Sequence, residues 1–137
     1  MQKILFLFII AAFLSCNDKN SSVPGIYVNT YVYLNNPSSN ALSSVGGSIY
    51  ADGGLKGLIV YKRGEGDFAA YERNCSYNSK DACAIVNLDT KNTTGANCNC
   101  CHSSFTLIDG TRVSGPATEP LRHYQTLLEG NVIHIFN

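Results

Sequence analysis

Apolar and polar positions alternate in the first part of the chain that carries a structural pattern. Between Ile26 and Leu34, aliphatic residues and Thr30 occupy every second position, and Tyr and Asn residues fill the positions between them. This period of two is typical of a β-strand with one buried face. A turn-rich segment at 35–40 ends the pattern.

Shorter apolar stretches, separated by glycine-rich breaks, predict the remaining strands. No segment has the apolar spacing of a long amphipathic helix. The pattern therefore predicts one all-β domain, an antiparallel barrel or sandwich, without an internal repeat or a second domain. The further strands that we expect lie at 48–51, 55–62, 67–73 and 83–88, with a terminal hairpin formed by 123–128 and 132–136.

The amino terminus has the features of a secretory signal. Lys3 precedes an apolar run at 4–14, which is too short to span a hydrocarbon core about 30 Å thick. The run ends in Ser15-Cys16 and then turns polar, which resembles the bacterial lipoprotein signal; an ordinary secretory signal with an incidental cysteine is the alternative. The preferred interpretation gives a signal peptide at 1–15, a polar tether at 16–24 with lipid on Cys16, and a folded domain at 25–137.

Composition and charge narrow the classes of partner. Ten basic and ten acidic side chains give a formal net charge of zero, and no cluster of Lys and Arg is present in the sequence. Nucleic-acid binding is therefore not expected, because it depends on neutralising phosphates. Membrane attachment must then come from the lipid on Cys16. We expect a monomer on the extracytoplasmic side of the bacterial cell envelope, where disulfides persist.

The cysteines carry the candidate chemistry. Beyond Cys16 the chain has five, an odd number that cannot all pair within one chain. Three of them, Cys98, Cys100 and Cys101, lie in a run of five residues that ends at His102. A loop of this kind can present several thiolates toward one point, as iron and zinc sites require, although the spacing does not name the metal.

This cysteine run and the segments after it resemble the second cluster-binding loop of Rieske iron–sulfur domains. The family pattern is Cys-Pro-Cys-His-Gly-Ser-x-Phe/Tyr, then a turn, a Gly-Pro-Ala loop that covers the cluster, and a closing Leu and Tyr. Here the corresponding residues are Cys98 to Phe105, then Asp109-Gly110, the loop Gly115, Pro116 and Ala117, and Leu121 and Tyr124. Upstream, Cys75 falls in the first loop, and the resemblance over about 57–136 implies a Rieske-like β sandwich or barrel with two hairpin loops at the site.

Transferring the roles residue by residue shows where this chain departs from the family. Rieske domains hold one iron with two Cys and the other with two His. The resemblance places Cys75 and Cys98 at the Cys positions, but Tyr77 and Cys101 at the His positions. It also implies a loop-to-loop disulfide between Cys83 and Cys100.

Other assignments of the same residues remain open. A slipped register keeps His102 as a ligand but puts Asn99 at a Cys position. Cys75, Cys98 and Cys101 could instead form a second disulfide and leave one thiol, hold a nonstandard [2Fe–2S] cluster, or bind a structural zinc ion.

Two functions from different classes follow. The first is a non-enzymatic binding or structural module whose [2Fe–2S] site has degenerated, and the alternative is an electron-transfer protein with a nonstandard Cys-rich cluster. An enzyme is not expected, because the sequence has no Ser/His/Asp arrangement, phosphate-binding glycine loop or paired-carboxylate motif. The partner of either kind, whether a redox protein or another envelope protein, is not specified by the sequence.

Overall fold

A computed structural model describes residues 23–137 of the chain. The expected signal peptide, the lipid-bearing Cys16 and most of the tether lie outside these residues. Within the described part, no helix is long and apolar enough to cross a membrane.

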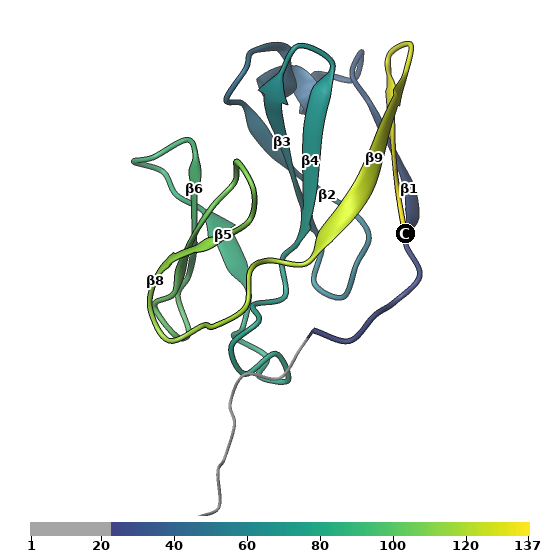
Figure 1. Cartoon of the computed structure of the whole chain (residues 1–137). Helices are drawn as coiled ribbons and strands as arrows, with labels where there is room; N and C mark the ends of the chain where they lie inside the picture. The colour runs from purple at the N-terminus through teal and green to yellow at the C-terminus, as the bar shows by residue number, and fades with distance from the viewer. Residues whose placement is uncertain (1–22) are drawn as a thin grey trace, which may run out of the picture.

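Ten strands and one short helix make up the described structure, which confirms the prediction of an all-β fold (Figure 1). All strand pairs are antiparallel. The elements are β1 (Asn29–Tyr33), the 3₁₀ helix η1 (Pro37–Ser43), β2 (Ser48–Ala51), β3 (Leu58–Gly64), β4 (Asp67–Glu72), β5 (Val86–Leu88), β6 (Gly95–Cys98), β7 (Ser104–Thr106), β8 (Arg112–Ser114), β9 (His123–Glu129) and β10 (Val132–Phe136).

The strands form two sheets. The larger has the order β1-β10-β9-β4-β3-β2, and the smaller has the order β5-β6-β7-β8. Strands β4 and β9 are neighbours in the larger sheet. The whole smaller sheet, β5 to β8, is therefore inserted in the sequence between two strands that pair with each other. Figure 1 shows the smaller sheet beside the larger, with its long loops at one end of the molecule.

Two hydrophobic clusters explain why the strand β3 is buried on both faces. Leu58 and Val60 point into a cluster within the larger sheet, together with residues of β1, β9 and β10. Ile59 and Tyr61 point the other way, into a cluster shared with the smaller sheet. The sequence of a strand that is covered on both faces is a continuous apolar run and does not alternate between apolar and polar residues.

Several sequence predictions of local structure need correction. The segment at 35–40 is not only a turn: Asn36 caps η1 by accepting a hydrogen bond from the Ser38 amide, and Leu42 at the far end of this helix is buried. The strand expected at 55–62 begins only at Leu58, and the one expected at 83–88 begins only at Val86. Strands β6, β7 and β8 were not predicted as strands, because they are short and rich in Gly, Asn, Ser and Thr.

A fully buried carboxylate, Glu72, ties the end of β4 to the turn before β3. Its oxygens accept hydrogen bonds from the amides of Leu55 at 2.7 Å, Lys56 at 3.1 Å and Asn74 at 2.9 Å. The Tyr124 hydroxyl donates a fourth, at 3.0 Å. This satisfied carboxylate draws residues 55 and 56 out of the strand, which explains the late start of β3.

The buried phenol of Tyr71 predicts how stability changes at alkaline pH. Its hydroxyl donates a hydrogen bond of 3.1 Å to the Leu107 carbonyl, and burial raises the pKa of Tyr71 from 10.0 to about 12. Because the unfolded chain ionises first, the stability from this group is complete below pH 10 and is lost as pH rises through about 12. We expect the midpoint of urea unfolding to fall across this window.

The Tyr71→Phe variant is the matched test of this effect. It loses about 1 kcal/mol at neutral pH with its hydrogen bond, but its unfolding midpoint should fall less steeply than that of the parent above pH 10. Some alkaline sensitivity should remain, because burial and the nearby Glu72 also raise the pKa of Tyr124. An unchanged pH profile in the variant would contradict the assignment to Tyr71.

Candidate metal centre

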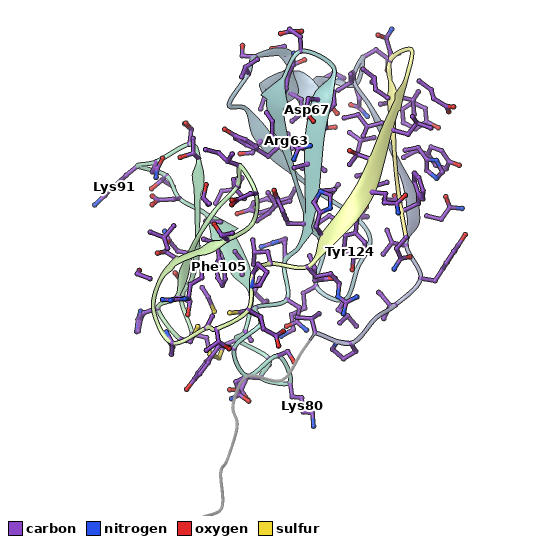
Figure 2. The ribbon with its side chains drawn as sticks, viewed as in Figure 1. Arg63, Asp67, Lys80, Lys91, Phe105 and Tyr124 are labelled. Atoms are coloured by element: carbon purple, nitrogen blue, oxygen red, sulfur yellow. A yellow bond between two sulfur atoms is a disulfide. The ribbon has the colours of Figure 1, made fainter. Side chains whose placement is uncertain are left out.

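Two loops at one end of the smaller sheet bring the cysteines together. The first loop joins β4 to β5 and carries Cys75 and Cys83, and the second joins β6 to β7 and carries Cys100 and Cys101. Cys98 is the last residue of β6. Figure 2 shows the sulfur atoms gathered where these loops meet.

A disulfide links the two loops. Cys83 and Cys100 are bonded, with their Cα atoms 5.5 Å apart and a sequence separation of 17. This is the pair that the resemblance to Rieske domains implies. The loops are therefore fixed relative to each other by a covalent bond that uses none of the other three cysteines.

The remaining three cysteines converge on one point. The sulfur atoms of Cys75, Cys98 and Cys101 all lie within 4.8 Å of one another, and those of Cys75 and Cys101 are 3.6 Å apart. Cys75 and Cys98 are completely buried, whereas Cys101 is half-buried. Two loops and one strand end thus form a group of three free thiols, which we call the thiol group.

The members of the thiol group differ in acidity. Burial is the main cause that raises the pKa of the Cys75 thiol well above its usual value. Burial also acts to raise the pKa of Cys101, but hydrogen bonds with the Ser103 hydroxyl and amide, and with Cys98 and Cys75, outweigh it and hold this pKa below its usual value. Cys101 therefore ionises more readily than Cys75.

Ser103 links the thiol group to the loop that contains Gly115, Pro116 and Ala117. Its hydroxyl accepts a hydrogen bond of 3.2 Å from the Cys101 thiol and one of 3.0 Å from the Ala117 amide. Gly115 has a φ of +91°, and a Cβ atom there would lie 2.4 Å from the Cα atom of Ser103. Only glycine allows this loop to lie so close over the second cysteine loop.

A cavity of about 330 Å³ borders the thiol group on its exposed side. Tyr77 is half-buried at this cavity, while the His102 side chain is exposed and its ring nitrogens do not belong to the thiol group. Asn78 and Asp81, for which the sequence predicts no role, complete the wall. The cavity is lined by Tyr77, Asn78, Asp81, Cys100, Cys101, His102 and Pro116.

A second cluster of ligand-type atoms lies next to the first. It consists of Asp81, Cys83 and Cys100, with all three atoms within 4.8 Å of one another. Its two sulfurs are bonded to each other, so they are not thiolates that could bind a metal ion. The thiol group is the better candidate for metal binding.

Comparison with solved structures identifies the fold. The cyanobacterial plasma membrane Rieske protein PetC3 from Synechocystis PCC 6803 superposes with a TM-score of 0.56 at 20% identity, over 81% of this chain and 98% of that one. A chain from the complex of reduced oxygenase and oxidized ferredoxin in carbazole 1,9a-dioxygenase gives a TM-score of 0.52 at 19% identity, over 77% and 92%. The chain has the Rieske fold. No family model and no curated protein matches the sequence.

The Rieske fold gives the thiol group a place within a known architecture. The two loops that carry it follow β4 and β6 and are closed by the Gly115-Pro116-Ala117 loop. Among the described residues, however, the atoms brought together are three sulfurs, and no imidazole nitrogen is among them. This is the observation on which a functional proposal must rest.

Lys56 fixes the first cysteine loop and was not recognised from the sequence. Its ammonium group donates to three carbonyl oxygens of this loop, those of Ser79 at 3.4 Å, Asp81 at 2.5 Å and Ala84 at 3.2 Å. The Lys56 amide is itself held by the buried Glu72. No local sequence pattern signals this role, because the partners lie 23 to 28 residues away.

We expect the Lys56→Met variant to loosen the first cysteine loop without unfolding the sheets. Methionine keeps most of the apolar stem but removes all three donors, so amide hydrogen exchange at 76–84 should accelerate about tenfold or more, the equivalent of losing 1.4 kcal/mol of protection. Lys91→Met is the matched control, because Lys91 is exposed and far from this loop (Figure 2). Equal exchange in the two variants would contradict the role of Lys56.

Proposed function

We propose that this protein is a non-enzymatic binding or structural module of the bacterial cell envelope, with a Rieske fold whose [2Fe–2S] site has degenerated. The observation that carries the proposal is the composition of the thiol group. It has Cys101 where the family has a histidine, and Tyr77 stands at the other histidine position. This donor set does not fit a cluster held by two Cys and two His.

The surroundings of the two replaced positions support the proposal. A neutral phenol, with an ordinary pKa of about 10, is a poor substitute for imidazole near neutral pH. His102 is the nearest imidazole in sequence, but its side chain is exposed and outside the thiol group. Its backbone has a φ of 59°, and its amide donates a hydrogen bond of 2.8 Å to the Cys98 carbonyl.

Anchorage by lipid on Cys16 completes the proposal. The polar segment after Cys16 and the absence of a basic cluster in the sequence favour attachment through acyl chains rather than through charge. Membrane association is compatible with the likeness to a plasma membrane Rieske protein. We further propose that the protein is a monomer that meets its partner on the extracytoplasmic side.

Iron and acid-labile sulfide analysis, with a visible absorption spectrum, tests the degenerate site. We expect protein made in a host with iron–sulfur assembly to contain neither component and to lack the redox wave of a Rieske centre. The matched variant is Tyr77→His with Cys101→His, which restores the ligand set of the family and should gain iron and sulfide if the loops still have the Rieske geometry. Stoichiometric iron and sulfide in the parent would refute the proposal.

The convergence of three thiols favours one second candidate. Cysteine-rich sites also hold [2Fe–2S] clusters, so Cys75, Cys98 and Cys101 with a fourth ligand could hold a nonstandard cluster in an electron-transfer protein. Iron and sulfide in the parent, with a reversible redox wave, would establish this candidate in place of the first.

The Cys16→Ser variant tests the lipid anchor independently of the site. We expect it to lose lipid labelling and to give an uncleaved precursor or a soluble product. Unchanged mass and membrane association in this variant would show that the protein is not a lipoprotein, and would leave the conclusion about the thiol group untouched.

A further inference from the structure

We propose that Cys75, Cys98 and Cys101 bind a single zinc ion, with the fourth coordination position open to the neighbouring cavity. The inference rests on the proposed function, because a [2Fe–2S] cluster would occupy the same cysteines.

The spacing of the sulfurs matches one ion. Zinc–sulfur bonds of about 2.3 Å at tetrahedral angles place two sulfurs about 3.8 Å apart. The Cys75 and Cys101 sulfurs are 3.6 Å apart, and no pair in the thiol group exceeds 4.8 Å. One centre is therefore within bonding reach of all three sulfurs after small movements. A two-iron cluster divides its ligands between two metals, which requires a wider set of donors.

The charge and burial of the site favour a divalent ion. Three thiolates bring a charge of −3 into a place where two of them are completely buried, and an uncompensated buried charge is costly. Zinc leaves a net charge of −1, whereas a monovalent ion such as Cu(I) leaves −2. Both metals accept soft thiolate ligands, so the charge balance is what selects zinc.

The two loops are held in place by contacts that do not involve the thiol group. The Cys83–Cys100 disulfide joins them, and the Lys56 ammonium group holds the first loop through three of its carbonyl oxygens. The Cys101 thiol in addition donates a hydrogen bond to the Ser103 hydroxyl. The sulfurs are therefore brought together by loops whose positions do not depend on contacts of the thiols alone, as a site prepared for a ligand requires.

The cavity makes the fourth coordination position of the zinc ion accessible from outside. Cys101 is the half-buried member of the thiol group, and it lies in the wall of the cavity of about 330 Å³. A water molecule, or a small soft anion, can reach the ion from this side. Three protein ligands and one exchangeable ligand are the pattern of zinc sites that bind a further molecule, whereas a purely structural zinc site has four protein ligands.

Metal analysis of the full-length protein in detergent tests the proposal. We expect one zinc per chain by mass spectrometry of the metal content, and no acid-labile sulfide. A chelator should remove the zinc, after which three thiols should become titratable. Adding back zinc chloride alone should protect these thiols from alkylation and raise the melting temperature.

Single serine variants locate the ligands. Cys75→Ser, Cys98→Ser and Cys101→Ser should each lower the zinc content, whereas Cys16→Ser, which removes the proposed lipid but no member of the thiol group, should keep one zinc per chain. If a buried variant fails to fold, the removal and return of zinc in the parent still decides the question.

Each of the other possible results of the metal analysis contradicts a specific part of the proposal. Three free thiols without metal, or a Cys75–Cys101 disulfide found by non-reducing peptide mapping, would refute the zinc site but leave the proposed function standing. One copper per chain would overturn the choice of metal. Iron with acid-labile sulfide would overturn both the zinc site and the proposed function.

Discussion

Replacing Cys83 and Cys100 together by serine is expected to lower the melting temperature by roughly 12 °C, as measured by calorimetry. The disulfide spans a sequence separation of 17 residues. By the chain-entropy model a loop of this length contributes about 3 kcal/mol, and in a domain near this size each kcal/mol corresponds to roughly 4 °C. The two cysteine loops have little strand pairing of their own, so they should show the largest gain in hydrogen exchange.

Chemical reduction supplies the control for this double variant. Mild reduction of the parent should cause the same fall in melting temperature, while reduction of the variant should cause no further loss. A variant as stable as the parent would mean that the loops are held by their non-covalent contacts, chiefly those of Lys56 and Ser103.

Glu72→Ala is expected to reduce the free energy of unfolding by at least about 3 kcal/mol. The substitution leaves three backbone amides and the Tyr124 hydroxyl without their acceptor. The bonds of the Asn74 amide and the Tyr124 hydroxyl are buried, and those of the Leu55 and Lys56 amides are partly buried. Each buried donor without a partner costs about 1–3 kcal/mol. Because small domains are stable by only about 5–15 kcal/mol, part of the population should unfold under mild conditions.

Two further variants separate the buried carboxylate from a general effect of removing charge. Glu72→Gln keeps the volume and one accepting oxygen, so urea unfolding should show a loss between those of the parent and Glu72→Ala. Glu129→Ala, at an exposed position in the terminal hairpin, should change the free energy by less than about 0.5 kcal/mol. A similar effect at both glutamates would contradict the role assigned to Glu72.

The sequence predicts the larger sheet well, because its pattern is set by burial. The alternation around Val28 and Val32 appears in the structure as buried positions between exposed ones, and β2 and β10 have the expected bounds. The smaller sheet could not be predicted in the same way. Strands such as β8, with all three residues exposed, form because a neighbouring strand offers hydrogen bonds, and no local apolar pattern records that.

The candidate site, too, is predicted from the sequence only where its residues form a local pattern. The cysteine spacing and the Gly-Pro-Ala segment indicate the loops of the site, because each of these patterns lies within a short stretch of sequence. The contacts of Lys56 with the first loop, and of Ser103 with Ala117, join distant parts of the chain. The convergence of Cys75 with Cys101, 26 residues apart, likewise depends on how the two cysteine loops pack against each other.

The attachment of Val23 to the first cysteine loop affects how the protein would meet other molecules. Val23 is buried beside Ser76 in the first cysteine loop, where the Arg122 guanidinium donates a hydrogen bond to the Val23 carbonyl. If Cys16 carries the proposed lipid, the seven residue steps of the tether from Cys16 to Val23 place Val23 at most about 25 Å from the lipid. The cysteine loops would then stay close to the lipid headgroups, and a partner would meet them by lateral diffusion within the plane of the bilayer.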